Sequence, residues 1–106
     1  MAEHQQKPTI GRIVHYRLDD QDAAHINQRR AHALTQSKAA GHAFPVHTGN
    51  AATAGDVYPM TITRVWGDTS DSAVNGQVLL DGNDVHWVTS ATQGEGPRHY
   101  QWPTRV

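Results

Sequence analysis

Three runs of alternating apolar and polar residues follow one another in the second half of the chain, and they constrain its fold more than any other feature. They lie at residues 57–66, 74–81 and 85–91. A period of two with many β-branched residues is typical of strands that bury one face. The sequence DGND at 81–84 separates the last two runs, and its residues accept the positive φ angles of a tight turn. These runs therefore predict antiparallel strands, the last two joined as a hairpin.

Two more segments are expected to join this sheet. Residues 10–18 alternate with the same period, and residues 99–102 form a short run that stops at Pro103. Within the run at 57–66, Pro59 lacks a backbone N–H and favours an edge strand or the start of a strand. In residues 10–18 the alternation assigns one face to Ile10, Arg12, Val14, Tyr16 and Leu18. In residues 57–66 it assigns one face to Tyr58, Met60, Ile62, Arg64 and Trp66.

One segment between the first two strands has helical spacing instead. Two aspartates at 19–20 supply an N-cap, and Asp22 in the first turn complements the helix dipole. The stripe that recurs three or four positions apart consists of Ala23, Ile26, Arg30, Ala33 and Leu34. Lys38 and Gly41 are typical of the end of a helix. These features predict an amphipathic helix from residue 20 to about residue 38.

Together these elements predict an α+β chain that is mainly β: a small antiparallel sheet or partial barrel of four to five strands with one amphipathic helix. The 106 residues fit a single domain, with a flexible lead at 1–9 and a long loop at 39–56 that holds Phe44. Only 37% of the residues are apolar, so the core of one chain is expected to be thin. Self-association would bury more apolar surface, and a homo-oligomer is therefore predicted.

The charge and the cysteine content exclude several classes of protein. The formal net charge is −1 and the basic residues are scattered, whereas a protein that binds duplex DNA needs a basic excess to neutralise phosphates. The chain has no cysteine, which excludes disulfides, thiolate catalysis and cysteine-based zinc sites. Neither a signal peptide nor an apolar run near the ~20 residues of a membrane helix is visible. The predicted location is a cytoplasm, or a particle assembled in one.

No motif in the sequence points to catalysis or to a bound metal. The G-x-S-x-G motif, the phosphate-binding loop and the dinucleotide-binding glycine pattern are all absent. The eight histidines are spread along the chain, and His25 and His32 would share a helix face without an HExxH motif or a dense carboxylate cluster. We therefore expect a protein that is not an enzyme, with no metal and no cofactor.

Aromatic and arginine side chains on the predicted strands are the candidates for ligand binding. Trp66, Trp87 and Trp102 lie at or near strands, where indoles commonly pack in a core or a subunit interface. The alternative is a stacking platform for a nucleobase or another flat ligand, with arginines holding phosphate and asparagines contacting a base or ribose. The candidate ligand-binding residues are Arg12, Tyr16, Arg64, Trp66, Asn75, Asn83, Trp87, Arg98 and Trp102.

Three parts of the sequence resemble segments of a known group of proteins. They are IGRIVHY at 10–16, VWGD at 65–68 together with VNGQVLLDGND at 74–84, and HYQWPTRV at 99–106. Together they resemble a widespread family of short, mostly uncharacterised proteins of tailed phages and prophages, which pair an IGRIVHY-like strand with an ending like GTWHWPERV. The resemblance covers most of the chain except the helix and the loop at 35–56. The chain departs from the usual ending at Tyr100, where tryptophan is common.

The resemblance implies phage biology, in which two roles suit a small oligomeric β-protein. One is an anti-defence sponge in the host cytoplasm, which sequesters a nucleotide-derived immune signal, such as a cyclic oligonucleotide or an ADP-ribose derivative, without cleaving it. The other is a virion component, such as a capsid decoration or head–tail protein. The sponge is the preferred interpretation, and it implies a pocket between subunits with Arg12 and Trp66 or Trp87 as its principal contacts.

Overall fold

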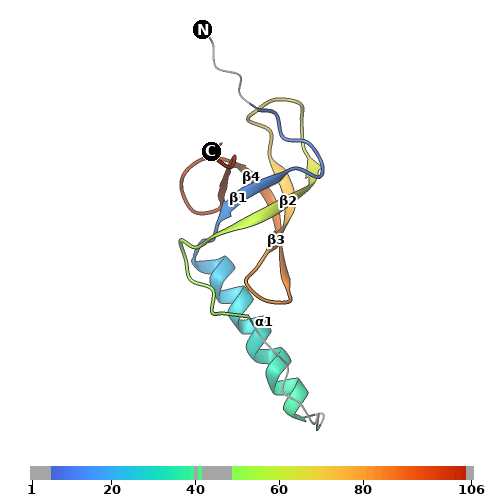
Figure 1. Cartoon of the computed structure of the whole chain (residues 1–106), viewed down its shortest axis with the longest axis vertical. Coiled ribbons are helices and arrows are strands. Elements are labelled where there is room, and N and C mark those ends of the chain that lie inside the picture. The colour runs from blue at the N-terminus through green and yellow to red at the C-terminus, as the bar shows by residue number, and fades with distance from the viewer. Residues whose placement is uncertain (1–5, 40, 42–48, 105–106) are drawn as a thin grey trace.

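The computed structural model of this chain describes residues 6–39, 41 and 49–104. Within them the elements are, in order, β1 (Ile13–Arg17), α1 (Asp20–Ala39), β2 (Val57–Val65), β3 (Val74–Leu79), β4 (Val85–Gln93) and β5 (His99–Gln101). The strands close into a barrel in the order β1-β2-β3-β4-β5, because β5 pairs with both β4 and β1. Figure 1 shows α1 extending away from one end of this barrel. The predicted α+β, mainly β fold is confirmed, and the barrel is closed.

One strand pair of the barrel differs from the others in direction. The pairs β1–β2, β2–β3, β3–β4 and β1–β5 are antiparallel, whereas β4 and β5 are parallel, with Thr92 opposite His99. The predicted antiparallel pairing therefore holds for four of the five pairs, and the β4–β5 pair is the exception. The link at 94–98 turns back on itself, with the His99 N–H donating to the Gly96 carbonyl at 3.3 Å. Strand β5 therefore runs in the same direction as β4, and its pairing with β1 closes the barrel.

The inward side chains of the strands form the core together with the first turns of α1. Tyr16 and Tyr100 are the largest fully buried side chains, and they pack with aliphatic residues from every longer strand. The alternation predicted for residues 10–18 is confirmed from Val14 to Leu18, where every second side chain is fully buried. Ile10, assigned to the same face, precedes β1 and is 72% exposed. Tyrosines, and not tryptophans, therefore fill the centre of the barrel.

A β-bulge interrupts the alternation of β2. Met60 and Ile62 are fully buried as predicted, but the pairing with β3 shifts between Ile62 and Arg64. An extra residue at a bulge turns the following side chains to the other face. Arg64 and Trp66 are therefore exposed, and their predicted place on the face of Met60 is wrong.

Only part of α1 packs on the barrel. Ala23 and Ile26 are buried against its end, and the predicted apolar stripe continues through the buried Arg30. Farther along, Leu34 is half-buried and Ala33 is exposed, so the stripe ends earlier than predicted. In Figure 1 this half of the helix projects beyond the strands. No helix in the described part of the chain is long and apolar enough to cross a membrane.

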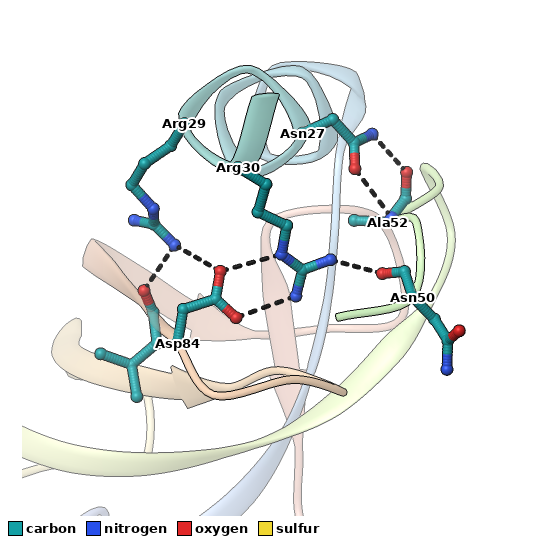
Figure 2. A network of polar contacts seen from close by, with 7 residues as sticks. Asn27, Arg29, Arg30, Asn50, Ala52 and Asp84 are labelled. Atoms are coloured by element: carbon teal, nitrogen blue, oxygen red, sulfur yellow. Dashed lines mark hydrogen bonds and ion pairs between the residues drawn. The ribbon is translucent and has the colours of Figure 1, made fainter. Parts of the chain in front are cut away.

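A network of hydrogen bonds fixes the middle of α1 to two other segments (Figure 2). The Arg30 guanidinium donates to both carboxylate oxygens of Asp84, at the end of the β3–β4 turn, with Nε–Oδ2 and Nη2–Oδ1 distances of 2.9 Å each. Its Nη1 donates to the carbonyl of Asn50. Beside it, Asn27 exchanges two hydrogen bonds with the backbone of Ala52. Because the Arg30 side chain is only 9% exposed, these contacts satisfy a buried charge and set the position of the helix.

The described part of the predicted 39–56 loop docks on the turn of the β3–β4 hairpin. The Asn50 N–H donates to the Asp81 carbonyl at 3.0 Å, and a Cβ added at Gly49 would lie 2.1 Å from the same carbonyl oxygen. A side chain at position 49 would therefore force the loop off the hairpin. Phe44 of this loop lies outside the described residues, as do residues 1–5 of the predicted lead.

Asp84→Ala should lower the free energy of unfolding by about 2–3 kcal/mol, because it leaves the Arg30 guanidinium buried without its carboxylate. Arg29→Ala is the matched control: Arg29 is 49% exposed and lies 3.3 Å from the same carboxylate, so its loss should cost less than about 1 kcal/mol. Urea denaturation near neutral pH, followed by circular dichroism, measures both changes. Equal losses in the two variants would mean that the burial of Arg30 does not determine the strength of this network.

Candidate functional site

Helix α1 begins with a reciprocal pair of aspartates. The Asp22 N–H donates to Asp19 Oδ1 at 2.7 Å, and the Asp19 N–H donates to Asp22 Oδ2 at 3.0 Å. This is a capping box, in which the N-cap residue and the third helical residue satisfy each other's backbone donors, here with aspartate in place of the usual glutamate. The capping role predicted for the aspartates at the helix start is confirmed for this pair.

The Asp22 carboxylate also binds two side chains of the barrel. Tyr16 Oη of β1 donates to Oδ2 at 2.6 Å, and His86 Nε2 of β4 lies 2.9 Å from Oδ1. The Asp22 and His86 side chains are only 7% and 11% exposed. Burial by itself raises the pKa of Asp22, but the hydrogen bonds that it accepts, from His86 first, outweigh burial and hold the pKa well below its usual value. Asp22 is therefore ionised in the folded protein at neutral pH.

The ionised state of Asp22 sets the direction of its contact with His86. An ionised carboxylate only accepts hydrogen bonds, so His86 Nε2 donates to it. No described residue forms a hydrogen bond with the other ring nitrogen, Nδ1, which therefore stays available to a ligand.

A pocket of about 200 Å³ lies where the start of α1 meets β4 and the link before β5. Its lining consists of Gln21, Asp22 and His25 of α1, His86, Trp87, Val88 and Thr89 of β4, and Arg98. We call it the Trp87 pocket. Trp87 is 60% exposed, and within the described residues no aromatic ring or cation stacks on its indole. The pocket thus brings Trp87, Arg98 and several uncharged polar residues together in one lining.

Arg98 reaches this pocket from a left-handed backbone conformation. Its φ is 66°, a region that costs a non-glycine residue about 1–2 kcal/mol. Its N–H donates to the Arg17 carbonyl at 2.9 Å, a contact that helps to hold the turn. The side chain is 48% exposed and its partner is Asp19, with an Nη1–Oδ2 distance of 3.9 Å. So long and exposed an ion pair contributes little, and the guanidinium keeps most of its donors for a ligand.

The other two tryptophans each have an arginine on the ring. The guanidinium carbon of Arg64 lies 4.0 Å from the ring centroid of Trp66, and that of Arg12 lies 4.9 Å from the ring centroid of Trp102. Trp66 Nε1 also donates to Asn75 Oδ1 at 3.1 Å. One face of each indole is therefore occupied within the chain, and both are less open to a flat ligand than Trp87 is.

The nine candidate residues predicted from the sequence do not form one site. Seven of them form three groups: Trp87 with Arg98, Trp66 with Arg64 and Asn75, and Trp102 with Arg12. Tyr16 is fully buried and donates a hydrogen bond to Asp22, which lines the Trp87 pocket. Its ring therefore has no exposed face for stacking. Asn83 lies exposed in the turn between β3 and β4.

Several residues of the Trp87 pocket are missing from the sequence-based candidates. The alternation of residues 85–91 could have identified His86, because it places His86 on the inward face with Val88. A buried imidazole needs a hydrogen-bond partner. Nothing in their spacing marks Gln21 and His25, since both belong to the polar side of the helix. No group of three or more His, Cys, Asp or Glu residues within the described ranges is arranged to hold a metal ion.

Asp22→Ala should lower the free energy of unfolding by about 3 kcal/mol near neutral pH, because it removes the acceptor of the Asp19 N–H and leaves the Tyr16 hydroxyl buried without an acceptor. A carboxyl group whose pKa is lowered by folding stabilises the fold above its unfolded pKa of about 3.9, and this contribution is lost as the pH falls toward the folded pKa. The cost of the substitution should therefore shrink below about pH 4.

The control is Asp20→Ala, an exposed residue of the same helical turn, which should cost about 0.5 kcal/mol. Urea titrations of both variants at neutral and at acidic pH measure the two losses. The same loss for Asp22→Ala at both pH values would contradict an ionised, hydrogen-bonded Asp22.

No protein-family model matches this chain, and no curated protein and no solved structure matches it significantly. The resemblance to short phage proteins stays a prediction, and the functional argument rests on the geometry of the site.

Proposed function

We propose that this chain is a non-catalytic binding protein whose Trp87 pocket captures a nucleotide-derived ligand. The observation that carries the proposal is the presence of Trp87 and Arg98 in one pocket, with an indole that is 60% exposed and has a free face. Stacking of a base on an aromatic side chain is worth about 1–3 kcal/mol, and a guanidinium pairs with phosphate through two parallel hydrogen bonds. The base stacks on Trp87 and a phosphate pairs with Arg98.

Uncharged groups around these two residues supply the remaining contacts. The Thr89 hydroxyl and the Gln21 amide both donate and accept, and the imidazole of His86 adds a ring nitrogen without a partner, so they suit the hydroxyls of a ribose and the edge of a base. The Asp22 carboxylate would repel a phosphate, but donors from three residues surround it and disperse its charge. The phosphate therefore lies on the Arg98 side of the pocket.

The pocket of one chain is too small for a whole nucleotide. Its volume of about 200 Å³ is below the roughly 300–1,000 Å³ of most small-molecule sites. Next to Trp87 the outer face of the barrel carries Leu79 and Val85, which are paired across β3 and β4 and are 44% and 45% exposed. A second copy of the chain packed on this face would cover both side chains and enclose the ligand, in agreement with the homo-oligomer expected from the thin core.

Capture without cleavage corresponds to an anti-defence sponge in the phage setting that the sequence resemblance implies. The ligand would be a cyclic oligonucleotide or an ADP-ribose derivative in the host cytoplasm, and neither duplex DNA nor a membrane is a partner. The buried Asp22–His86 pair is similar to an acid/base dyad. The test must therefore follow the fate of the ligand as well as its binding.

Native mass spectrometry of the protein mixed with cyclic dinucleotides, cyclic trinucleotides and ADP-ribose derivatives tests this proposal. The expected result is a discrete oligomer that gains stoichiometric ligand mass and releases the ligand unchanged on denaturation. A released ligand of altered mass would show an enzyme. An oligomer that takes up none of the panel would rule out the sponge.

Two substitutions separate ligand binding from stability. Trp87→Ala should weaken binding of the captured nucleotide by about tenfold or more through the loss of stacking. Arg98→Gly should remove the phosphate contact while keeping stability or raising it by up to about 1 kcal/mol, because glycine accepts a φ of 66°. Isothermal titration calorimetry and thermal unfolding measure the two effects.

The control is Trp66→Ala, which removes an exposed indole outside the pocket and should leave the affinity for the nucleotide unchanged. A loss of affinity comparable to that of Trp87→Ala would contradict the assignment of the site.

The alternative is a virion structural protein, and the outer face of the barrel is the observation in its favour. Ile13, Val57, Leu79 and Val85 are each between 43% and 45% exposed and suit packing against neighbouring subunits in a shell. This role predicts copies of the chain in purified particles and no small-molecule ligand. Proteomics of such particles distinguishes it from the sponge.

A further inference from the structure

One edge of β4, beside the Trp87 pocket, has no neighbouring strand. Strand β3 pairs with β4 from Val85 to Ala91, but β5 pairs with it only from Thr92 onward. On the side away from β3, the residues before Thr92 therefore carry backbone groups that no described strand bonds. Residues 86–89 belong to this stretch and all line the Trp87 pocket. The edge of β4 is thus open to a ligand in this pocket.

The direction of the backbone groups can be followed from β2 to β4. Ile62 of β2 donates its N–H to the Arg12 carbonyl at 2.9 Å and accepts the Gly11 N–H at 2.8 Å, so both of its groups face β1. Gly76 of β3 lies opposite Ile62. Opposite residues of an antiparallel pair either bond each other or both point away from each other. The backbone groups of Gly76 therefore face β4, where its partner is Val88.

The same rule identifies the free groups of β4. Val88 bonds β3, and backbone groups of successive residues in a strand point to opposite sides, so those of Trp87 and Thr89 point away from β3. An independent contact agrees with this. The Val85 carbonyl, two residues before Trp87, accepts from Arg29 Nη2 of α1 at 2.8 Å. No described residue bonds the backbone N–H or carbonyl of Trp87 or Thr89.

A β-bulge fixes the far end of this open stretch. The register between β3 and β4 shifts at Asn75, and Ser90 has a φ of 55°. The Ser90 N–H donates to Asn75 Oδ1 at 3.0 Å, and the same oxygen accepts from Trp66 Nε1 at 3.1 Å. Trp87 and Thr89 themselves are exposed. Their free backbone groups are therefore both accessible and held in a fixed frame.

The order of the free groups decides which ligand fits. Along the edge they are the N–H and carbonyl of Trp87, followed by the N–H and carbonyl of Thr89. The Trp87 carbonyl thus stands beside the Thr89 N–H as an acceptor next to a donor. Adenine has the complementary pair on two of its edges, because its N6 amino group lies between the acceptors N1 and N7. Guanine has two acceptors, N7 and O6, on one edge, and on the other its 2-amino group adds a donor that would meet the Trp87 N–H.

We propose that the open edge of β4 binds an adenine base, with the N6 amino group donating to the Trp87 carbonyl and the Thr89 N–H donating to N1 or N7. This inference rests on the proposed capture of a nucleotide and names the base of that ligand. The pocket is too small for a whole nucleotide, but it has to hold only the base, while the phosphate lies at Arg98. An ADP-ribose derivative and a cyclic oligonucleotide that contains adenine both meet this requirement.

Amide hydrogen exchange followed by ¹H–¹⁵N NMR tests the open edge without a ligand. The Trp87 and Thr89 amides should exchange at least about tenfold faster than the His86 and Val88 amides, because only the latter two bond β3. Equal protection of all four amides would mean that the edge is covered, and the proposal would be wrong.

Three nucleotides test the recognition of the base: AMP, N6,N6-dimethyl-AMP and GMP. AMP should shift the Thr89 amide signal and the Trp87 indole signal in a saturable manner. The dimethyl derivative has no N6 proton to donate, and both it and GMP should bind about tenfold more weakly than AMP. Equal affinity for AMP and its dimethyl derivative would overturn the inference and leave nucleotide capture intact. If AMP moves neither signal the inference is also wrong, and the panel of cyclic oligonucleotides and ADP-ribose derivatives decides separately on nucleotide capture.

Thr89→Pro removes the donor on the protein side. Proline is accepted in a strand where the N–H points away from the neighbouring strand, so the pairing of β4 with β3 loses no hydrogen bond. The variant should bind AMP about tenfold more weakly. Thr89→Val is the matched control: it removes the hydroxyl and keeps the N–H, so the preference for AMP over its dimethyl derivative should persist. Loss of that preference would mean that the hydroxyl, and not the backbone, recognises the base. If the proline variant fails to fold, the comparison of the three nucleotides on the unaltered chain still decides.

Discussion

The carboxylate of Asp22 accepts hydrogen bonds from three parts of the chain: Tyr16 on β1 at 2.6 Å, His86 on β4 at 2.9 Å, and the backbone of Asp19 in the helix cap at 3.0 Å. A buried carboxylate costs several kcal/mol unless donors surround it. This arrangement is stable only when the helix, the first strand and the fourth strand are all in place. The Trp87 pocket lies where these elements meet, so its shape depends on the same carboxylate.

A second ion pair restricts the helix further along its axis. Arg30 lies eight residues after Asp22, about 12 Å along the helix, and binds Asp84 through two hydrogen bonds of 2.9 Å each. Asp84 and His86 flank the first residue of β4, so both contacts tie α1 to the start of the same strand. With two points of attachment the helix can neither rotate nor slide against β4. Trp87, the next residue of that strand, is thereby held beside the helix start, which favours a pre-formed site over one that a ligand must assemble.

Short-range patterns predict most of the elements, whereas the rest depends on contacts between distant segments. The alternation of β1, the hairpin turn at 81–84 and the helix cap follow from neighbouring residues, and all three are confirmed. The bulge after Ile62 and the parallel pairing of β5 leave no local signal, because each is set by the closure of the barrel. The same limit applies to the site. The aromatic and arginine side chains are recognisable one by one, but the bulge decides that Trp66 turns outward, and barrel closure decides that Arg98 joins Trp87.

The way in which the polar groups at the helix end of the barrel are satisfied limits what a ligand could contact there. At the helix end the buried carboxylate already has its donors, so a ligand must interact with the groups that remain free, an indole face and a guanidinium. Such contacts favour flat and anionic molecules and tolerate variation in the rest of the ligand. In the proposed function, these free groups therefore provide affinity for a class of ligands and not for a single member of that class.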